Sequence, residues 1–205
     1  MTGVPSKWLL DLPRAFDLDQ RLIGAPKSKQ LFVDGYVRAK PGDQVLDLGC
    51  GTGALLRGLQ QGVEYVGVDV DRAYVERARE RFRGRGTFVC ADVTAFRPST
   101  RFDVVIAYGL LHHLDDEHLR RTLEVARDAL DAQGRAVFAE PCSTPDQGPL
   151  ERALMNHDRG AHIRSADRYV DAMREFFAEV AADVVAGTYR IPFTIVVLEA
   201  RSGAN

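Results

Sequence analysis

The chain has 205 residues, of which 45% are hydrophobic and 27% are charged, and its formal net charge at pH 7 is -2. This length suits one domain with one sizeable core, and the charge balance excludes the strongly basic surface typical of nucleic-acid or anionic-membrane binding. The longest apolar runs have the length of strands, well short of the roughly 20 residues that span a bilayer.

The start of the chain lacks the continuous apolar region of a signal peptide, because Asp11 and Pro13 interrupt its apolar patch. We therefore expect a cytoplasmic protein. Three cysteines, an odd number without C-x-x-C spacing, favour reduced thiols and give no metal-ligand pattern. We expect no metal, no nucleic-acid partner and no membrane contact.

Residues 1–40 predict an N-terminal helical segment or lid, with aromatic residues such as Trp8 and Phe16 and a helix over 27–39. From residue 41 onward, short apolar runs alternate with helical patterns. Strands are expected at 44–49, 64–70, 86–90, 102–109 and 135–141, and helices at 54–60, 71–82 (capped by Asp71), 115–130 and 165–180.

This alternation, with strands apolar on both faces, indicates a parallel sheet covered by helices. Two further strands, 182–191 and 193–200, are separated by little more than Pro192, which is too short for a parallel crossover, so they should form an antiparallel hairpin at the sheet edge. The sequence predicts a doubly wound α/β domain over 41–205, with its ligand at the carboxyl ends of the central strands.

Three glycines, Gly49, Gly51 and Gly53, follow the first predicted strand in "VLDLGCGTG". Such density brings a ligand close to the main chain, but it is equally typical of NAD-binding folds. Asp69 ends the second predicted strand, 22 positions after Asp47, where a carboxylate can accept both hydroxyls of a ribose. Together these features select a nucleoside-containing cofactor.

Two further acids narrow the choice. Asp47 lies two residues before Gly49, where a carboxylate is unfavourable beside a pyrophosphate but favourable near a cation. Asp92 in "CADV" follows the third strand and can accept from an adenine amino group. These acids fit a ligand that has an adenine, a ribose and a positive centre but no phosphate, and S-adenosylmethionine is such a ligand.

Over about residues 27–200 the chain resembles the class I S-adenosylmethionine-dependent methyltransferases. "VLDLGCGTG" resembles their motif I and "GVDVD" their second-strand motif, and "CADV", "FDVVIAYGLLHHL" and "ALDAQGRAVFAEP" resemble the later motifs in order. The resemblance implies a Rossmann-like sheet of seven strands in the order 3-2-1-4-5-7-6, with strand 7 antiparallel, and S-adenosylmethionine as the cofactor.

The resemblance also implies roles at the cofactor. Gly49 and Gly51 would back its methionine and ribose portions, Asp69 would hold the ribose, Asp92 would face the adenine, and Tyr108 would lie near the methyl group. The full set of expected cofactor-binding residues is Asp47, Gly49, Cys50, Gly51, Gly53, Asp69, Val70, Asp92, Val93 and Tyr108.

Methyl transfer is an in-line displacement that needs a base only if the acceptor must lose a proton. His112 and His113, just past the fourth strand, are candidates for this base, with His112 expected to face the site and His113 to be structural. A purely structural role for both remains open. Cys142, after strand five, is a poor candidate for a nucleophile, because the chain lacks the second cysteine and basic face of RNA cytosine methyltransferases.

A polar cap insert over about 142–165 precedes the last predicted helix. Arg164, Arg168 and Tyr169 are candidate acceptor-binding residues, because an arginine can take a carboxylate or phosphate by paired hydrogen bonds. The alternative is an ion-pair network between Asp158 and the arginines that only fixes the cap.

We thus expect a methyltransferase that acts on an oxygen or nitrogen of a small molecule, as a monomer or homodimer. The alternatives are an NAD(P)-dependent oxidoreductase and a non-catalytic, cofactor-binding partner protein. The acceptor itself stays open.

Overall fold

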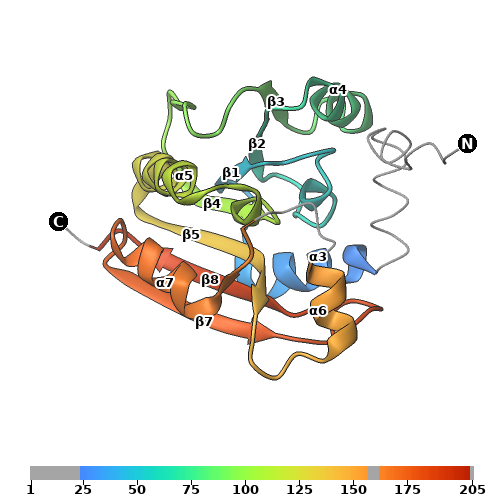
Figure 1. The fold of residues 1–205 in the computed structure, drawn as a ribbon. Coiled ribbons are helices and arrows are strands. Elements are labelled where there is room, and N and C mark those ends of the chain that lie inside the picture. The colour runs from blue at the N-terminus through green and yellow to red at the C-terminus, as the bar shows by residue number, and fades with distance from the viewer. Residues whose placement is uncertain (1–23, 157–161, 204–205) are drawn as a thin grey trace, which may run out of the picture.

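A mixed β-sheet forms the centre of the molecule, and the computed structural model describes residues 24–156 and 162–203 of it (Figure 1). The sheet order is β3-β2-β1-β4-β5-β8-β7, and the short β6 pairs with the end of β5. The strands are β1 (Gln44–Leu48), β2 (Glu64–Asp69), β3 (Thr87–Cys90), β4 (Phe102–Tyr108), β5 (Leu130–Ser143), β6 (Arg164–Ser165), β7 (Glu179–Val185) and β8 (Ile195–Arg201).

Strands β1 to β5 run parallel, and β8 lies antiparallel to both β5 and β7. This confirms the predicted order, because β7 and β8 are the sixth and seventh strands expected from the sequence and the two-residue β6 shifts the numbering by one. The parallel strands therefore end at one edge of the sheet, and the β7–β8 connection returns to that same edge.

The helices are α3 (Ala25–Phe32), continued by a π-helix (Val33–Val37), α4 (Arg72–Arg81), α5 (Asp116–Ala129), α6 (Pro149–Asn156) and α7 (Ala166–Arg174), with 3₁₀ turns at Leu55–Arg57 and Leu111–His113. Side chains cap three helix starts. Asp71 accepts from two amides of α4, as the sequence predicts, and Asp115 and Ser165 each accept from one amide of their helices.

Two apolar clusters cover the two faces of the sheet. One packs α5 and α7 against it through residues such as Leu123 and Met173. The other includes Phe32 of α3 and Val75 of α4 together with Ile106 of β4. The described part of the expected N-terminal segment thus belongs to the core of the domain, whereas Trp8 and Phe16 lie outside the described residues.

The structure departs from the sequence expectations at several elements. The helix expected over 54–60 is only a 3₁₀ turn, Leu55–Arg57. The helix predicted over 165–180 ends at Arg174, because residues from Glu179 onward pair with β8. The hairpin connection runs over 186–194 rather than turning at Pro192 alone. In addition, β5 begins at Leu130, five positions before its predicted start, and α6 lies within the expected cap insert. In the described ranges no helix combines the length and apolarity that a membrane span requires.

Candidate functional site

A cavity of about 520 Å³ lies where β1, β2, β3 and β4 end. Every cofactor-binding residue expected from the sequence lines it except Gly53. The structure therefore brings together residues that are spread over four strands, as expected for the carboxyl edge of a doubly wound sheet. Lys29, Tyr74, Leu110, His113 and His118 are among the further lining residues.

The glycine loop after β1 has two functions. Gly51 lines the cavity at φ 52°, and a Cβ placed on it would meet no atom within 4 Å. Gly53 has φ 73°, and its Cβ would lie 3.0 Å from ring atoms of both Phe82 and Phe88. Gly51 thus keeps the main chain open to a ligand, whereas packing against two aromatic rings explains Gly53.

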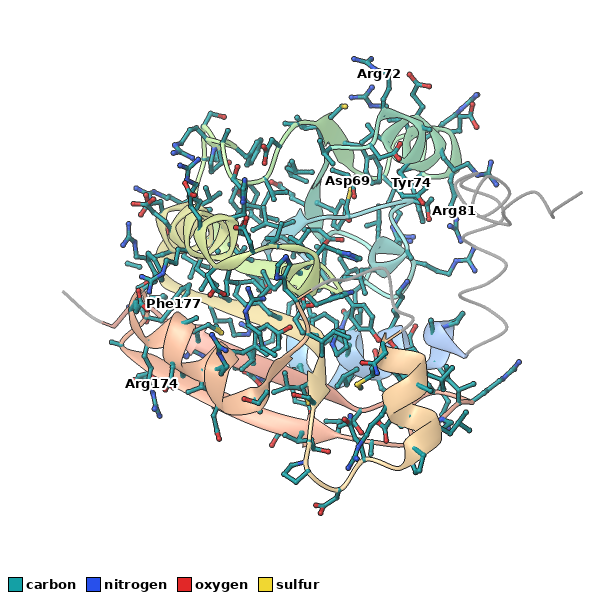
Figure 2. All side chains as sticks on the ribbon, viewed as in Figure 1. Asp69, Arg72, Tyr74, Arg81, Arg174 and Phe177 are labelled. Atoms are coloured by element: carbon teal, nitrogen blue, oxygen red, sulfur yellow. The ribbon has the colours of Figure 1, made fainter. Side chains whose placement is uncertain are left out.

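Asp69, the last residue of β2, also lines the cavity (Figure 2). One carboxylate oxygen accepts from the Gly51 amide at 2.8 Å and the other from the Asp71 amide at 2.9 Å. Burial raises the pKa of Asp69, and these two amide bonds oppose that rise. Because a carboxylate oxygen can accept more than one hydrogen bond, Asp69 can anchor the loop and still accept from a ligand.

Asp47 is the most deeply buried acid of the cavity, with 1% of its surface exposed. Its Oδ2 accepts from the Tyr65 hydroxyl at 2.6 Å, whereas its Oδ1 is buried and has no hydrogen-bond partner in the described part of the chain. Burial raises the pKa of Asp47 to about 7, against the opposing effect of the Tyr65 bond. A buried acceptor without a donor is costly, so this oxygen is suited to receive a donor from a ligand.

Lys29 brings the opposite charge to the same cavity from α3. Its Nζ lies 5.6 Å from the centre of the Tyr108 ring. Sequence reasoning missed this residue, because nothing in the spacing of the motifs connects a residue of the N-terminal helix with strand ends that follow it in the chain.

Val70, Asp92 and Val93 line the cavity beyond the ends of β2 and β3, and the two exposed residues, Val70 and Asp92, form its rim. Val70 is 73% exposed, which is unusual for an apolar side chain of this size. Asp92 is exposed, and hydrogen bonds from the amide and hydroxyl of Thr94 lower its pKa. The rim therefore combines an apolar contact with an ionised acceptor.

Tyr108, which lines the cavity, belongs to a cluster of hydroxyl groups. The Tyr108 hydroxyl lies 2.7 Å from both Ser28 Oγ and the Tyr189 hydroxyl, and Ser28 Oγ donates to Thr188 at 3.2 Å. Burial raises the pKa of Tyr108 well above its ordinary value, so this phenol stays neutral. The cluster joins α3, β4 and the β7–β8 connection at one point.

The two histidines take the reverse of the expected positions. His113 lines the cavity, whereas His112 is 5% exposed and its Nδ1 lies 2.7 Å from Glu140 Oε2. Glu140 is fully buried and also accepts from the amides of Leu110, Leu111 and His112. It draws His112 inward and fixes the loop that carries His113. Sequence reasoning missed Glu140, although an acid inside the apolar run "RAVFAEP" was a visible signal.

Arg164 also binds this loop, through the backbone carbonyls of Leu111 and Leu114. All five of its N–H donors have acceptors: the Asp116 carboxylate and the backbone carbonyls of Leu111, Leu114 and His162. It is 7% exposed and does not line the cavity. The expectation that it binds an acceptor anion is therefore at odds with the structure, because no donor is left for a ligand.

The other two acceptor candidates also lie away from the cavity lining. Tyr169 is 1% exposed and its hydroxyl faces the Pro141 carbonyl at 3.5 Å. Arg168 is exposed, with its guanidinium 3.9 Å from the Asp116 carboxylate. Asp158, the alternative ion-pair partner, lies outside the described residues.

Cys142 is buried, and burial raises the pKa of its thiol to about 11, which makes it a poor thiolate. In residues 24–156 and 162–203, no three His, Cys, Asp or Glu side chains converge as a metal site.

Comparison with known proteins connects this cavity to one enzyme family. Residues 45–134 match the sequence profile of a methyltransferase domain. An uncharacterised methyltransferase of Mycobacterium tuberculosis is 40% identical over 75 residues, which are 35% of this chain and 38% of that protein. A probable tRNA methyltransferase 9B of Mus musculus is 35% identical over 104 residues, or 50% of this chain and 22% of that protein.

Among solved structures, phosphoethanolamine N-methyltransferase 2 of Haemonchus contortus, in complex with phosphomonomethylethanolamine and S-adenosylhomocysteine, superposes with a TM-score of 0.78. The match covers 98% of this chain and 60% of that one at 13% identity, so it shows a shared fold. In the two sequence comparisons, the matched segment is 38% and 22% of the relative, so the chain spans well under half the length of either protein.

Proposed function

We propose that this chain, which belongs to the class I S-adenosylmethionine-dependent methyltransferases, transfers a methyl group to an oxygen or nitrogen of a small-molecule acceptor. The observation that carries this proposal is the buried Asp47 Oδ1, which has no donor among the described residues although Asp47, Asp69 and Asp92 all line the cavity. Three carboxylates suit a cationic ligand with hydroxyl and amino donors, and they disfavour a pyrophosphate.

The lining residues fit S-adenosylmethionine along its whole length. Asp69 would accept the ribose hydroxyls, and Asp92, with Val93 beside it, would receive the adenine. Gly51 would allow the close approach of the ligand to the loop. At the amino-acid end, Asp47 would accept from the ammonium group, and Lys29 would pair with the carboxylate.

When bound, S-adenosylmethionine supplies an electrophilic methyl group on a positively charged sulfur. The residues of the chain position the cofactor and the acceptor and exclude water from them. Tyr108 lines the cavity, and its hydroxyl is neutral and held by two hydrogen bonds, so Tyr108 would position an acceptor without competing as a nucleophile. His113 is the lining imidazole, and it would take a proton from those acceptors that must lose one.

A small acceptor fits the charge of the site better than a polynucleotide does. Among the described residues that line the cavity, Lys29 is the sole lysine or arginine, whereas four aspartates line it: Asp47, Asp69, Asp71 and Asp92. Binding of RNA depends on several phosphate contacts by basic side chains. The similarity to a tRNA methyltransferase nevertheless makes RNA the competing acceptor class to test.

Equilibrium titration tests the cofactor. S-adenosylhomocysteine should bind in a saturable manner that Asp69→Ala weakens and the exposed control Asp146→Asn leaves unchanged, while NAD should not compete. Saturable NAD binding without S-adenosylhomocysteine binding would instead identify an oxidoreductase.

Transfer of a labelled methyl group tests the activity and the acceptor class. We expect label in the small-molecule fraction of a cell extract and none in purified tRNA. Label in tRNA would overturn the assignment of the acceptor, and cofactor binding without any labelled product would identify a non-catalytic partner protein.

A further inference from the structure

A second cavity, of about 590 Å³, lies where β8 ends and β7 begins, and it shares no lining residue with the first. It is located at the amino edge of the sheet, opposite to the carboxyl ends that form the cofactor cavity. Four arginines from four different elements line it, and we call it the arginine groove. They are Arg38 after the π-helix, Arg135 on β5, Arg174 at the end of α7 (Figure 2) and Arg201 at the end of β8.

The arginine groove has a net positive charge on a chain whose overall formal charge is -2. Glu179 and Glu199 are the two acids among its described lining residues, so four arginines minus two glutamates leave a charge of +2. Glu199 pairs with Arg38, whose Nη2 lies 2.6 Å from its carboxylate. Among the described residues that line the groove, the arginines thus outnumber the carboxylates.

Arg135 and Arg201 donate to backbone carbonyls, those of Val37 and Gln133. Arg174 lies 3.9 Å from Asp171, its neighbour on the exposed surface of α7. A carbonyl satisfies an N–H donor without cancelling the charge of the guanidinium. These hydrogen bonds therefore leave the charges of Arg135 and Arg201 in place, whereas Arg38 and Arg174 each have a carboxylate beside them.

The clustering of positive charges is unfavourable for Arg135. Its Nε is buried and has no hydrogen-bond partner in the described ranges. Burial lowers the pKa of its guanidinium, and the neighbouring charge of Arg38 lowers it further. An anion in the groove would supply a countercharge to Arg135 and Arg38.

We propose that the arginine groove binds a small phosphate anion, for which pyrophosphate is the simplest multivalent probe. The planar fork of a guanidinium matches the oxygens of a phosphate group, and an ion with two phosphates can contact arginines from more than one element. Four arginines around one groove of about 590 Å³ can surround a compact anion, so we commit to a free phosphate compound rather than to the backbone of a nucleic acid.

Titration calorimetry with pyrophosphate at constant ionic strength tests the proposal. We expect one saturable site per chain whose affinity S-adenosylhomocysteine does not change, because the two cavities share no residue. Arg38 has a φ of 48°, a backbone conformation that glycine adopts freely, so Arg38→Gly should fold well and weaken pyrophosphate binding about tenfold. Arg174→Gln, at an exposed position, should weaken it in the same direction.

Arg83→Gln is the matched control, because Arg83 is exposed and outside the groove, and its loss lowers the net charge equally. The proposal is overturned if pyrophosphate does not saturate the protein, or if Arg38→Gly and Arg174→Gln bind it as tightly as the parent protein. Equal weakening by Arg83→Gln would also overturn it, because the effect would then be one of overall charge. Binding of a single-stranded oligonucleotide but not of pyrophosphate would reject the proposed source of the phosphate.

Discussion

Replacing Asp47 with asparagine should stabilise the protein at alkaline pH and at the same time weaken its binding of S-adenosylhomocysteine. Burial raises the pKa of Asp47 from its ordinary value of 3.8 to about 7. Between these values the unfolded chain loses the proton of Asp47 while the folded chain keeps it, so the free energy of unfolding falls as pH rises through this window. The loss amounts to about 4 kcal/mol by about pH 8 and is close to zero below about pH 4.

Asparagine cannot ionise, and its side-chain oxygen can still accept from the Tyr65 hydroxyl. Asp47→Asn should therefore resemble the parent protein in urea unfolding at about pH 4 and exceed it in stability at about pH 8. The exposed Asp146→Asn serves as the control. A stability difference for Asp47→Asn that stays the same at both pH values would refute the reasoning, because it would show that the charge of Asp47 is not what the fold resists.

The same residue links pH to ligand binding. A cationic ligand group favours ionised Asp47, so the affinity for S-adenosylhomocysteine should rise as pH rises through about 7 in the parent protein. This pH dependence should disappear in Asp47→Asn. Titrations over this range, with both proteins folded, measure it directly.

Four further substitutions test other parts of the site. Asp69→Ala should weaken S-adenosylhomocysteine binding by about 1 to 3 kcal/mol, as measured by calorimetry, because ribose hydroxyls and the Gly51 amide lose their acceptor. Gly51→Ala should reduce this affinity, whereas Gly53→Ala should mainly lower the melting temperature by crowding two aromatic rings; equal effects of both on affinity would contradict the division. Glu140→Ala should destabilise the protein by about 3 to 5 kcal/mol, because it leaves three amides and the His112 ring without their buried acceptor. Chemical unfolding measures that loss, and an unaltered midpoint would show that the loop does not depend on Glu140.

Much of the fold could be predicted from local patterns. Strand-sized apolar runs and helical periodicity gave the element order, and the family resemblance supplied the sheet order that the structure confirms. The glycine loop, Asp69 and Asp92 could be placed at one cavity because parallel strands end at the same edge of a sheet. The end of α7 at Arg174 and the start of β5 at Leu130 could not be predicted in this way. Pairing of β7 with β8 and of β5 with β4 overrides the helical pattern at these positions.

The sequence by itself determined which carboxylates and glycines line one cavity, because each lies at or near the end of a strand that the neighbouring apolar residues predict. The tertiary structure alone decided which histidine faces the cavity, what Arg164 holds, and that Lys29 reaches Tyr108. Each of these outcomes depends on partners far away in the chain. Glu140 binds His112 and turns it away from the cavity, the loop carbonyls occupy the donors of Arg164, and packing of α3 against the sheet brings Lys29 to the cavity. Periodicity within one segment carries no information about such contacts.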